Sequence, residues 1–253
     1  MQQSFPLTGY IDLHAHILPG LDDGASTMQM ALDMARMAVA DGITCMVATP
    51  HLNPLSAWNN SAEVVRRALD TLRTHLNKAQ IPLQVEGAAE LRLTTKTLQQ
   101  LQSGYAPLLS HGPGPCRYAL IEFAHTGLQG AELFMTELLL HRGYTPVIAH
   151  PERIRTFREN PDRLEPFIKL GCLTQITASA ICGSYGDGVI QLVDGWMEKG
   201  WVHLIASDAH NIHRRQPAMR DAGRLLAAQF GHEAAQQLLI THPQAVLQGQ
   251  PLG

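Results

Sequence analysis

The sequence has few cysteines and few aromatic residues, and it contains no long hydrophobic run. Only four cysteines occur in 253 residues, and none forms a CxxC pair, which argues against a disulfide scaffold and against a thiolate zinc site. No run of about 18 apolar residues is present, so no membrane span is expected. Residues 1–6 carry neither the basic nor the apolar segment of a signal peptide. These absences predict a soluble, cytoplasmic protein.

Charge is also scarce. The 19 Lys and Arg residues and 22 Asp and Glu residues make up 16% of the chain and give a net charge of −3. Without a basic, aromatic-rich stretch, no nucleic-acid partner is expected. The apolar fraction of 45% is typical of a globular protein and excludes disorder and fibrous repeats. Histidine, in contrast, is abundant at 13 residues. It is the commonest metal ligand and carries protons near neutral pH.

Short apolar runs alternate with longer amphipathic stretches along the whole chain. The runs are nearly continuous in apolar residues, which is typical of parallel strands covered on both faces. The predicted strands cover residues 10–13, 44–49, 83–88, 118–123, 145–149, 173–177 and 202–206. The predicted helices cover residues 26–41, 61–80, 94–102, 131–142, 160–170, 188–199 and 216–230. Residues 103–116, rich in glycine and proline, are predicted to form a loop.

The order of these elements predicts an α/β fold. Seven β-then-α units without a change of composition indicate a single domain over residues 1–253, a (β/α) barrel that lacks one of the usual eight units. An open doubly wound sheet is the alternative, although no phosphate-binding glycine motif follows the first strand. Ser26 and Ser61 are the expected N-caps of two helices. Helix-ending glycines are expected at Gly42, Gly143, Gly171 and Gly200.

Ionisable residues follow the C-terminal ends of six predicted strands, which is the face where (β/α) barrels carry their chemistry. The spacing of His14 and His16 places both imidazoles on one face of a strand. Imidazoles and carboxylates without a thiolate suit Mn²⁺, Fe²⁺ or Zn²⁺, and nine such ligands are enough for two or three ions. The nine candidate ligands are His14, His16, Asp23, His51, Glu90, Glu122, His150, Asp208 and His210.

Each of these signals has a simpler explanation when it is taken alone. A single His-x-His pair is more often a core or surface pair, Glu90 and Glu122 could pair with Arg92, and His51 could be a turn residue. Ionisable groups at buried strand ends are, however, costly to bury without partners. A metal cluster accounts for all of them at once.

Two arginines, Arg153 and Arg215, each follow a strand end that bears candidate ligands. A guanidinium is a natural bidentate partner for phosphate, whereas a salt bridge with Glu152 or Asp221 is the alternative. Position alone does not decide between the two. No arginine stands six residues after any cysteine, so a phosphatase that uses a cysteine nucleophile in a Cys-x₅-Arg loop has no support.

Several motifs, in this order along the chain, resemble those of the PHP (polymerase and histidinol phosphatase) superfamily. They are Asp12-Leu-His-Ala-His16, Ala48-Thr-Pro-His51, Gly87-Ala-Ala-Glu90, Ile121-Glu122, Ala149-His-Pro-Glu-Arg153 and Ala206-Ser-Asp-Ala-His-Asn211. Residues 14–24 more narrowly resemble the bacterial capsule-type protein tyrosine phosphatases of that superfamily, and the resemblance extends over residues 10–249. Ile154 and Leu52 depart from the family's pattern at the rim of the site, which weakens the prediction of substrate but not that of metal.

The resemblance implies a distorted (β/α)₇ barrel with three metal ions, usually manganese. It assigns one ion to His14, His16, Asp208 and Glu90, a second to Glu90, Glu122 and His150, and a third to Asp23, His51 and His210, with Asp22 as an alternative to Asp23. In such enzymes a metal-bridging hydroxide attacks phosphorus. The implied catalytic residues are Arg153, Arg215, Asp23 and His210. The two arginines hold the phosphate, and an aspartate or a histidine of this set could protonate the leaving group.

The predicted function is therefore that of a metal-dependent phosphatase acting on a phosphotyrosine protein, a bacterial tyrosine kinase of polysaccharide export. Alternatives are a small-molecule phosphatase such as histidinol phosphatase, a phosphodiesterase, and a non-catalytic metal-bound interaction module. Residues Glu63 to Arg67 resemble a helix motif used for self-assembly in this group, so a homo-oligomer through this helix is a further expectation, with a solvated helix face as the alternative. Trp58 is expected at the rim, where it could stack on a phenolic ring.

Overall fold

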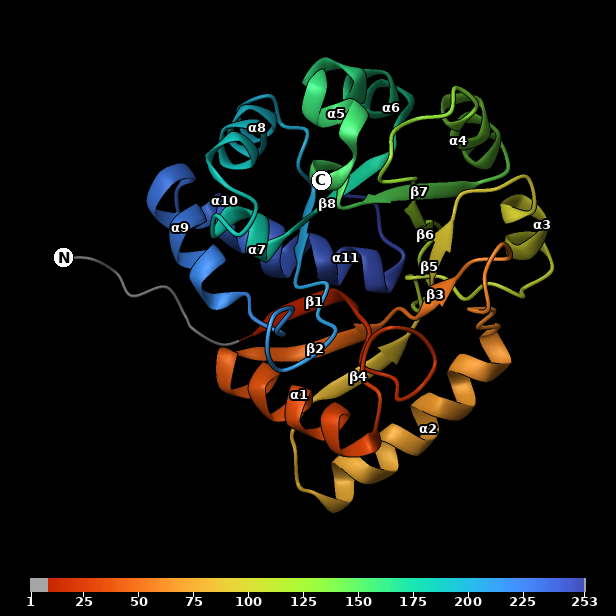
Figure 1. The fold of residues 1–253 in the computed structure, drawn as a ribbon, viewed down its shortest axis with the longest axis vertical. Helices are drawn as coiled ribbons and strands as arrows, with labels where there is room; N and C mark the ends of the chain where they lie inside the picture. Colours follow the sequence, from red (N-terminus) through yellow and green to blue (C-terminus); the bar gives the residue numbers. More distant parts are fainter. Residues whose placement is uncertain (1–8, 253) are drawn as a thin grey trace.

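The computed structural model describes residues 9–252 (Figure 1). Residues 1–6, from which no signal peptide is expected, lie outside this range. The strands are β1 (Tyr10–Ala15), β2 (Ile43–Ala48), β3 (His51–Leu52), β4 (Gln84–Gly87), β5 (Glu90–Arg92), β6 (Arg117–Glu122), β7 (Tyr144–Ala149), β8 (Leu173–Thr177) and β9 (Leu204–Ala206). The helices are α1 (Met28–Asp41), α2 (Ala62–Lys78), α3 (Thr97–Gln102), α4 (Glu132–His141), α5 (Arg155–Glu159), α6 (Glu165–Leu170), α7 (Ala178–Ile181), α8 (Asp187–Glu198), α9 (Arg220–Phe230), α10 (His232–Gln236) and α11 (His242–Gln248).

The strands pair in parallel and form two sheets. One sheet has the order β1-β2-β4, and the other has the order β3-β5-β6-β7-β8-β9. After a short break β2 is followed by β3, and β4 by β5, while a parallel bridge joins Ala15 to Ala209 just beyond β9. Most of the helices lie around the outside of the strands, whereas α11 appears in the middle of the view, and its Val246 packs among side chains of the strands (Figure 1). The α/β class with parallel strands is confirmed, but the strands form two sheets rather than the single closed sheet of the expected barrel.

Helix ends follow the predicted capping pattern with one exception. The Ser61 hydroxyl accepts a hydrogen bond from the Val64 N–H at the start of α2, as predicted. At the start of α1 the cap is Thr27, whose hydroxyl accepts from the Met30 N–H at 3.2 Å, so the prediction of Ser26 is wrong by one residue. Two adjacent hydroxyl residues fit the same sequence pattern, and only the extended backbone of Thr27 decides between them. The four predicted helix-ending glycines all have positive φ angles.

Several short helices and strands were not predicted from the sequence. The helices α5 and α7 and the C-terminal helices α10 and α11 span four to seven residues each, too few turns to show a clear period of 3.6. The strand predicted over residues 83–88 corresponds to β4. The separate strand β5, in which Glu90 pairs with His51 of β3, was not predicted. None of the described helices is long and apolar enough to cross a membrane.

Apolar side chains form two cores because side chains alternate between the faces of each strand. The larger core lies between the strands and the surrounding helices. The smaller core faces the other way and contains Ile11, Leu13, Cys45, Val47, Ala88, Leu109, Tyr118, Leu120, Val147, Ala149, Leu204 and Val246. The predicted loop 103–116 packs against the C-terminal segment here, since the His111 N–H donates to the Leu247 carbonyl at 2.8 Å. This packing fills the inside of the fold below the polar strand ends.

His203 makes the stability of the fold depend on pH. Its Nδ1 accepts a hydrogen bond from the Thr174 N–H at 3.2 Å, and burial, with a smaller contribution from His242, lowers the pKa of His203 to about 4. In the unfolded chain this pKa is about 6.5. Between these two values the unfolded state binds a proton that the folded state does not. The free energy of unfolding should therefore fall as the pH falls from about 6.5 to about 4, by up to about 1.4 kcal/mol per pH unit.

His203→Asn keeps an acceptor near the Thr174 N–H but removes the titration. Urea unfolding midpoints of this variant should decline less steeply over the same pH range than those of the unaltered protein. Parallel profiles for the two proteins would show that His203 does not carry this dependence.

Candidate metal centre

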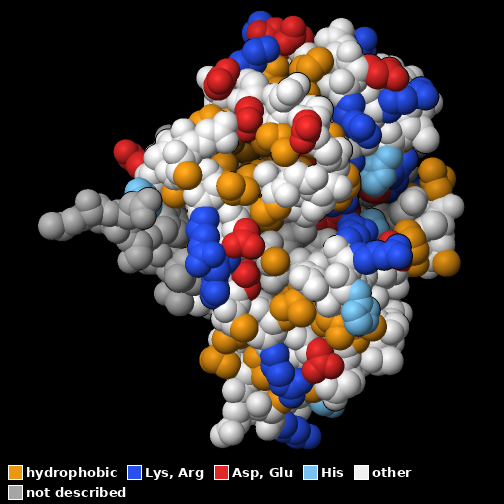
Figure 2. Space-filling model, turned by 60° about the vertical axis from the view of Figure 1, so that its left-hand side comes forward, with side chains coloured by type: hydrophobic (Ala, Val, Ile, Leu, Met, Phe, Trp, Pro, Cys, Tyr) orange, Lys and Arg blue, Asp and Glu red, His pale blue; other side chains and the backbone are white. Residues whose placement is uncertain are grey.

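Ionisable side chains from the strand ends converge into one connected set of clusters. Every one of the nine predicted ligands belongs to at least one group whose ligand atoms all lie within 4.8 Å of one another. The groups are His16, Asp23, His51 and His210; His14, His16 and Asp208; His14, Glu90 and His150; Glu122, His125 and His150; and His51, Glu90 and Glu122. Figure 2 shows histidine and basic side chains together towards the right-hand edge of the face that it draws.

His14 and His16 face each other through their Nε2 atoms, which are 3.2 Å apart. The Nδ1 of His14 lies 2.7 Å from the side-chain amide oxygen of Gln175, and the Nδ1 of His16 lies 2.6 Å from an Asp22 carboxylate oxygen. Both partners only accept hydrogen bonds, so the two Nδ1 atoms carry the protons and donate. In the neutral rings both Nε2 atoms then present lone pairs to each other. Such a contact is repulsive unless a proton or a metal ion lies between the two nitrogens, and the lone pairs directed at one point fit a metal ion.

The carboxylates that complete this cluster also present free electron pairs. Glu90 Oε2 lies 3.3 Å from the Nε2 of both His14 and His16, and Asp208 Oδ1 lies 3.4 Å from each. Asp208 Oδ1 and His210 Nε2 are buried and have no hydrogen-bond partner among the described residues, while the buried Glu90 Oε2 has His51 Nδ1 at 2.9 Å as its nearest nitrogen. Buried polar atoms are rarely left without a partner. Oxygen and imidazole donors in this arrangement match the ligands of Mn²⁺, Fe²⁺ or Zn²⁺.

The electrostatic field of the cluster favours a cation. Burial alone would raise the pKa of Asp208, but His14 and Arg153 hold this pKa well below its usual range. Burial alone would lower the pKa of His16, but its contacts with Asp208 and Asp22 raise this pKa well above its usual value. The buried carboxylates therefore stay ionised and draw positive charge onto the neighbouring nitrogens. A metal ion meets the same demand in place of a proton.

The two adjacent aspartates, Asp22 and Asp23, point in different directions. Asp23 Oδ1 lies 3.3 Å from His51 Nε2 and 3.4 Å from His210 Nε2. Asp22 instead accepts hydrogen bonds from His16 Nδ1 and from the His51 backbone N–H at 3.0 Å. The geometry thus favours Asp23 over Asp22 as the residue that faces an ion. Asp22 fixes the orientation of His16.

On the other side of Glu90 the cluster extends to His150 and Glu122. His150 Nε2 lies 2.7 Å from Glu90 Oε1, and its Nδ1 lies 3.4 Å from His125 Nε2. Glu122 Oε2 is 3.3 Å from Arg92, so the simpler explanation of a pair with this arginine holds for Glu122. Glu90 forms no such pair with Arg92 among the described residues. His125, which the sequence did not add to the ligand set, lies close enough to join Glu122 and His150.

The backbone at two cluster residues adopts the left-handed region, which non-glycine residues rarely occupy. His150 has φ +34° and Asp208 has φ +52°. The His150 N–H donates to the Gln175 carbonyl and the Asp208 N–H donates to the His14 carbonyl, both at 2.8 Å. Bonds to the neighbouring strands therefore hold each residue in an unfavourable conformation, which is a common feature of functional sites.

The two predicted phosphate-binding arginines meet at one carboxylate. Arg153 Nη1 donates to Asp208 Oδ2 at 2.5 Å, and Arg215 Nη2 donates to the same oxygen. The Nε atoms of both arginines are buried and donate to no described residue. Glu152 and Asp221, the salt-bridge partners considered from the sequence, bond instead to Thr177 and Arg224. Both guanidinium groups therefore lie beside the cluster with donors to spare.

Trp58 lies at the rim, as expected, but one face of its ring is already covered. Its indole stacks on the His51 imidazole with ring centroids 4.9 Å apart and an angle of 13° between the planes. The indole therefore supports a cluster residue, and only its other face is free to meet a ligand.

Comparison with known proteins places the chain in a family. The family model for capsular polysaccharide synthesis, CpsB/CapC, matches residues 10–248. The chain belongs to the CpsB/CapC family. The expected resemblance to the capsule-type phosphatases is thereby confirmed.

Two CpsB/CapC relatives cover nearly the whole chain. Tyrosine-protein phosphatase YwqE from Bacillus subtilis is 37% identical over 244 residues, which are 96% of this chain and 93% of YwqE. Tyrosine-protein phosphatase CpsB from Streptococcus pneumoniae is 28% identical over 246 residues, which are 95% of this chain and 99% of CpsB.

A crystal structure from work on these two proteins, described there as unique metal-dependent tyrosine phosphatases, matches with a TM-score of 0.88 at 36% identity. It covers 96% of each chain. The fold described above is therefore that of a solved CpsB/CapC relative.

Two supporting residues in this CpsB/CapC protein, Gln175 and Asp22, were not recognised from the sequence as partners of the histidines. The signal available from the sequence for Gln175 was an amide side chain within the predicted strand 173–177, and in the structure this side chain is fully buried. Its amide NH₂ donates to the Ile176 carbonyl at 2.9 Å, which orients the carbonyl oxygen towards His14. No spacing rule connects residues that lie this far apart in the chain.

Gln175→Met should weaken metal binding without unfolding the protein. The variant removes the acceptor of the His14 Nδ1–H, and loss of such a supporting hydrogen bond typically lowers metal affinity about 10- to 100-fold. Competition with a chromogenic chelator measures this affinity, and Gln236→Met on the exposed side of α10 is the matched control. Equal affinities of the two variants would show that Gln175 does not act through His14.

Proposed function

We propose that this protein is a metal-dependent phosphotyrosine-protein phosphatase that acts on a tyrosine kinase of polysaccharide synthesis in the cytoplasm. The observation that carries the proposal is the set of facing electron pairs on His14, His16, Glu90 and Asp208, directly beside two arginines. The names of the relatives, which are tyrosine-protein phosphatases, support the choice of substrate.

The nine predicted ligands are proposed to hold two or three divalent ions, with manganese as the first choice and iron or zinc as alternatives. When bound, such ions activate a water molecule and neutralise charge on phosphate oxygens. The donor set supports this assignment, since carboxylates and imidazoles are combined without a thiolate. The assignment of each residue to one ion stays a prediction.

Arg153 and Arg215 are proposed to hold the phosphate. Each has an unpaired buried Nε–H, and both are anchored through another nitrogen to Asp208. A guanidinium fixed at one corner can still offer its remaining donors to phosphate oxygens.

Asp23 and His210 are proposed to act chiefly as ligands. Although burial opposes ionisation, contacts with His210 and His51 keep the pKa of Asp23 well below its usual range. Burial, followed by the charge of His16, lowers the pKa of His210. Neither group therefore holds a proton readily near neutral pH. A tyrosine leaving group has a pKa of about 10, so it depends less on an acid than an alkoxide does.

We further propose that the two sheets act as one distorted seven-stranded barrel within a single domain. The succession of β2 and β3, that of β4 and β5, and the bridge between Ala15 and Ala209 support this arrangement. Self-association stays a prediction. In the proposed motif Arg67 pairs with Glu63 on an exposed face of α2, a contact that an ordinary solvated helix also makes.

The decisive experiment compares two phosphomonoesters in one manganese buffer. The protein should hydrolyse a phosphotyrosine peptide at least about tenfold more efficiently than histidinol phosphate, a difference of about 1.4 kcal/mol. A chelator should abolish both reactions. His14→Ala should do the same with an unchanged circular dichroism spectrum, because the loss falls on the site rather than on the core. A tenfold preference for histidinol phosphate would leave a phosphoesterase but exclude the phosphotyrosine assignment.

Arg153→Lys should lower kcat/KM by similar factors for p-nitrophenyl phosphate and for a phosphotyrosine peptide. The change keeps the positive charge but removes the planar pair of donors, and loss of a charged hydrogen bond corresponds to about 10- to 100-fold. Arg66→Lys on the exposed face of α2 is the matched control. Unequal losses for the two substrates would mean that Arg153 contacts the leaving group rather than the phosphate that both esters share.

A further inference from the structure

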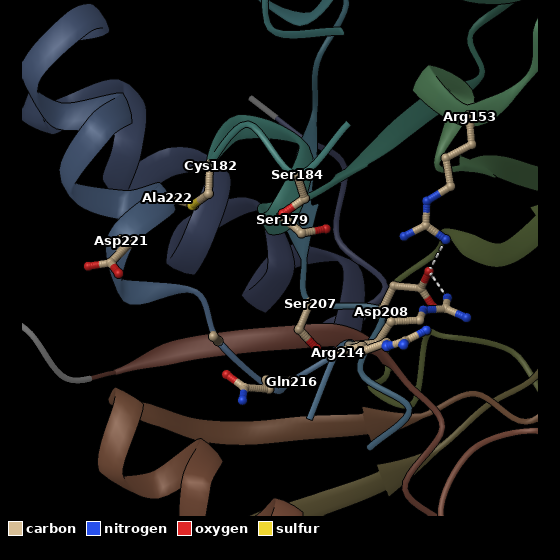
Figure 3. Close-up of a pocket in the computed structure, with 12 residues that line it drawn as sticks. Arg153, Ser179, Cys182, Ser184, Ser207, Asp208, Arg214, Gln216, Asp221 and Ala222 are labelled. Carbon is tan, nitrogen blue, oxygen red and sulfur yellow. Dashed lines mark hydrogen bonds and ion pairs between the residues drawn. The ribbon is translucent and has the colours of Figure 1, made fainter. Parts of the chain in front are cut away.

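A cavity of about 210 Å³ adjoins the two arginines, between α7 and the segment that leads from β9 into α9. Figure 3 shows Arg153, Asp208 and Arg214 at one end of this cavity and Asp221 at the other. Small side chains, among them Ser179 and Cys182, line the part between these ends. None of the predicted metal ligands except Asp208 lines it.

We propose that this cavity, here called the ring pocket, binds the aromatic ring of an aryl phosphomonoester such as phosphotyrosine. The inference rests on the proposed phosphatase function, and it locates the phenolic leaving group of the substrate in this cavity. The sequence suggested Trp58 as a contact for the ring, and the names of the relatives assign no ring-binding site.

The position of Asp208 connects the ring pocket to the metal centre. Its Oδ1 lies 3.4 Å from His14 Nε2, while its Oδ2 accepts from Arg153 at 2.5 Å. Asp208, Arg153 and Arg215 all line the ring pocket as well. A phosphate held by the two arginines therefore lies at the mouth of the ring pocket. The organic group that is bonded to the ester oxygen of this phosphate is then adjacent to the ring pocket.

The size and the lining of the ring pocket suit a single ring. Sites for drug-sized ligands measure about 300–1,000 Å³, so 210 Å³ is too small for an extended ligand. Apart from Gln216 and the charged residues at the two ends, the lining consists of hydroxyl, thiol and methyl side chains, which leave a space that a flat ring can enter. The guanidinium groups of Arg214 and Arg215 at the same end can pack against the face of an aromatic ring.

The charges along the ring pocket argue against a second anion. Three arginines lie at the end near the metal centre, whereas the carboxylate of Asp221, paired with Arg224 at 3.4 Å, lies at the far end. A second phosphate at that end would meet this carboxylate and be repelled. A neutral ring with one phosphate at the arginine end matches the distribution of charge.

Trp58 is the competing candidate for contact with the ring. It does not line the ring pocket, and it stacks on His51 instead. A bulky residue in the ring pocket leaves the other face of Trp58 unchanged. It should therefore block binding of the ring if the ring lies in the ring pocket, but not if the ring lies on Trp58.

The first test compares two phosphonates that share the anion and differ in the ring. Phenylphosphonate and methylphosphonate are titrated calorimetrically into manganese-loaded protein. Ala218→Phe, at an exposed position of the ring pocket, should weaken phenylphosphonate binding at least about tenfold and change methylphosphonate binding less than about twofold. Ala228→Phe, on the exposed side of α9, is the matched control and should change neither.

The second test uses Cys182 as a reporter inside the ring pocket. Cys182 is exposed, whereas Cys116 is half-buried outside the ring pocket and serves as an internal reference. Saturating phenylphosphonate should slow alkylation of Cys182 by iodoacetamide at least about fivefold, as followed by mass spectrometry, because a bound ring blocks access to the sulfur. Methylphosphonate should not slow it, and the rate at Cys116 should not change.

The outcomes separate this inference from the proposed function. If the unaltered protein binds neither phosphonate and does not hydrolyse p-nitrophenyl phosphate, the phosphatase function fails, and the inference fails with it. If it binds both but Ala218→Phe behaves like Ala228→Phe, the function stands and the ring pocket is overturned. Loss of phenylphosphonate binding in Trp58→Ala, with Cys182 unprotected, would place the ring at Trp58 instead.

Discussion

The Nε2 atoms of His14 and His16 lie 3.2 Å apart, and ionised oxygens of Glu90 and Asp208 lie within 3.4 Å of both. Such a group of acceptors in a buried place is unstable without positive charge among them, because the atoms have lost their contacts with water. The rest of the site is arranged around this demand for positive charge. It explains why so many histidines lie at one end of the strands.

The scaffold meets this demand by orienting the ligands through residues outside the cluster. Gln175 and Asp22 each bind the far nitrogen of one histidine, so that the near nitrogen points into the cluster. The left-handed backbone at His150 and Asp208 turns two further side chains towards the same centre. These features cost stability locally, and the inner apolar core beneath the cluster supports them.

Asp208 connects the metal centre to the surface that would receive a substrate. One of its oxygens faces the histidines, and the other accepts from both Arg153 and Arg215. The charge of this carboxylate is thus shared between two functions, the binding of a cation and the positioning of two guanidinium groups. A change at this residue would disturb both, so the arginines offer the cleaner way to separate them.

The sequence by itself determined the α/β class, most of the longer helices and strands, and the nine ionisable residues at the strand ends. It could do so because parallel strands place their C-terminal ends together, whatever the details of the packing. The tertiary structure decided what depends on contacts between distant parts of the chain. The proton positions on His14 and His16 depend on Gln175 and Asp22, and the arginine partners proved to be Asp208 rather than Glu152 or Asp221. The division of the strands into two sheets and the ring pocket beside α7 likewise arise from packing, which no local pattern of residues encodes.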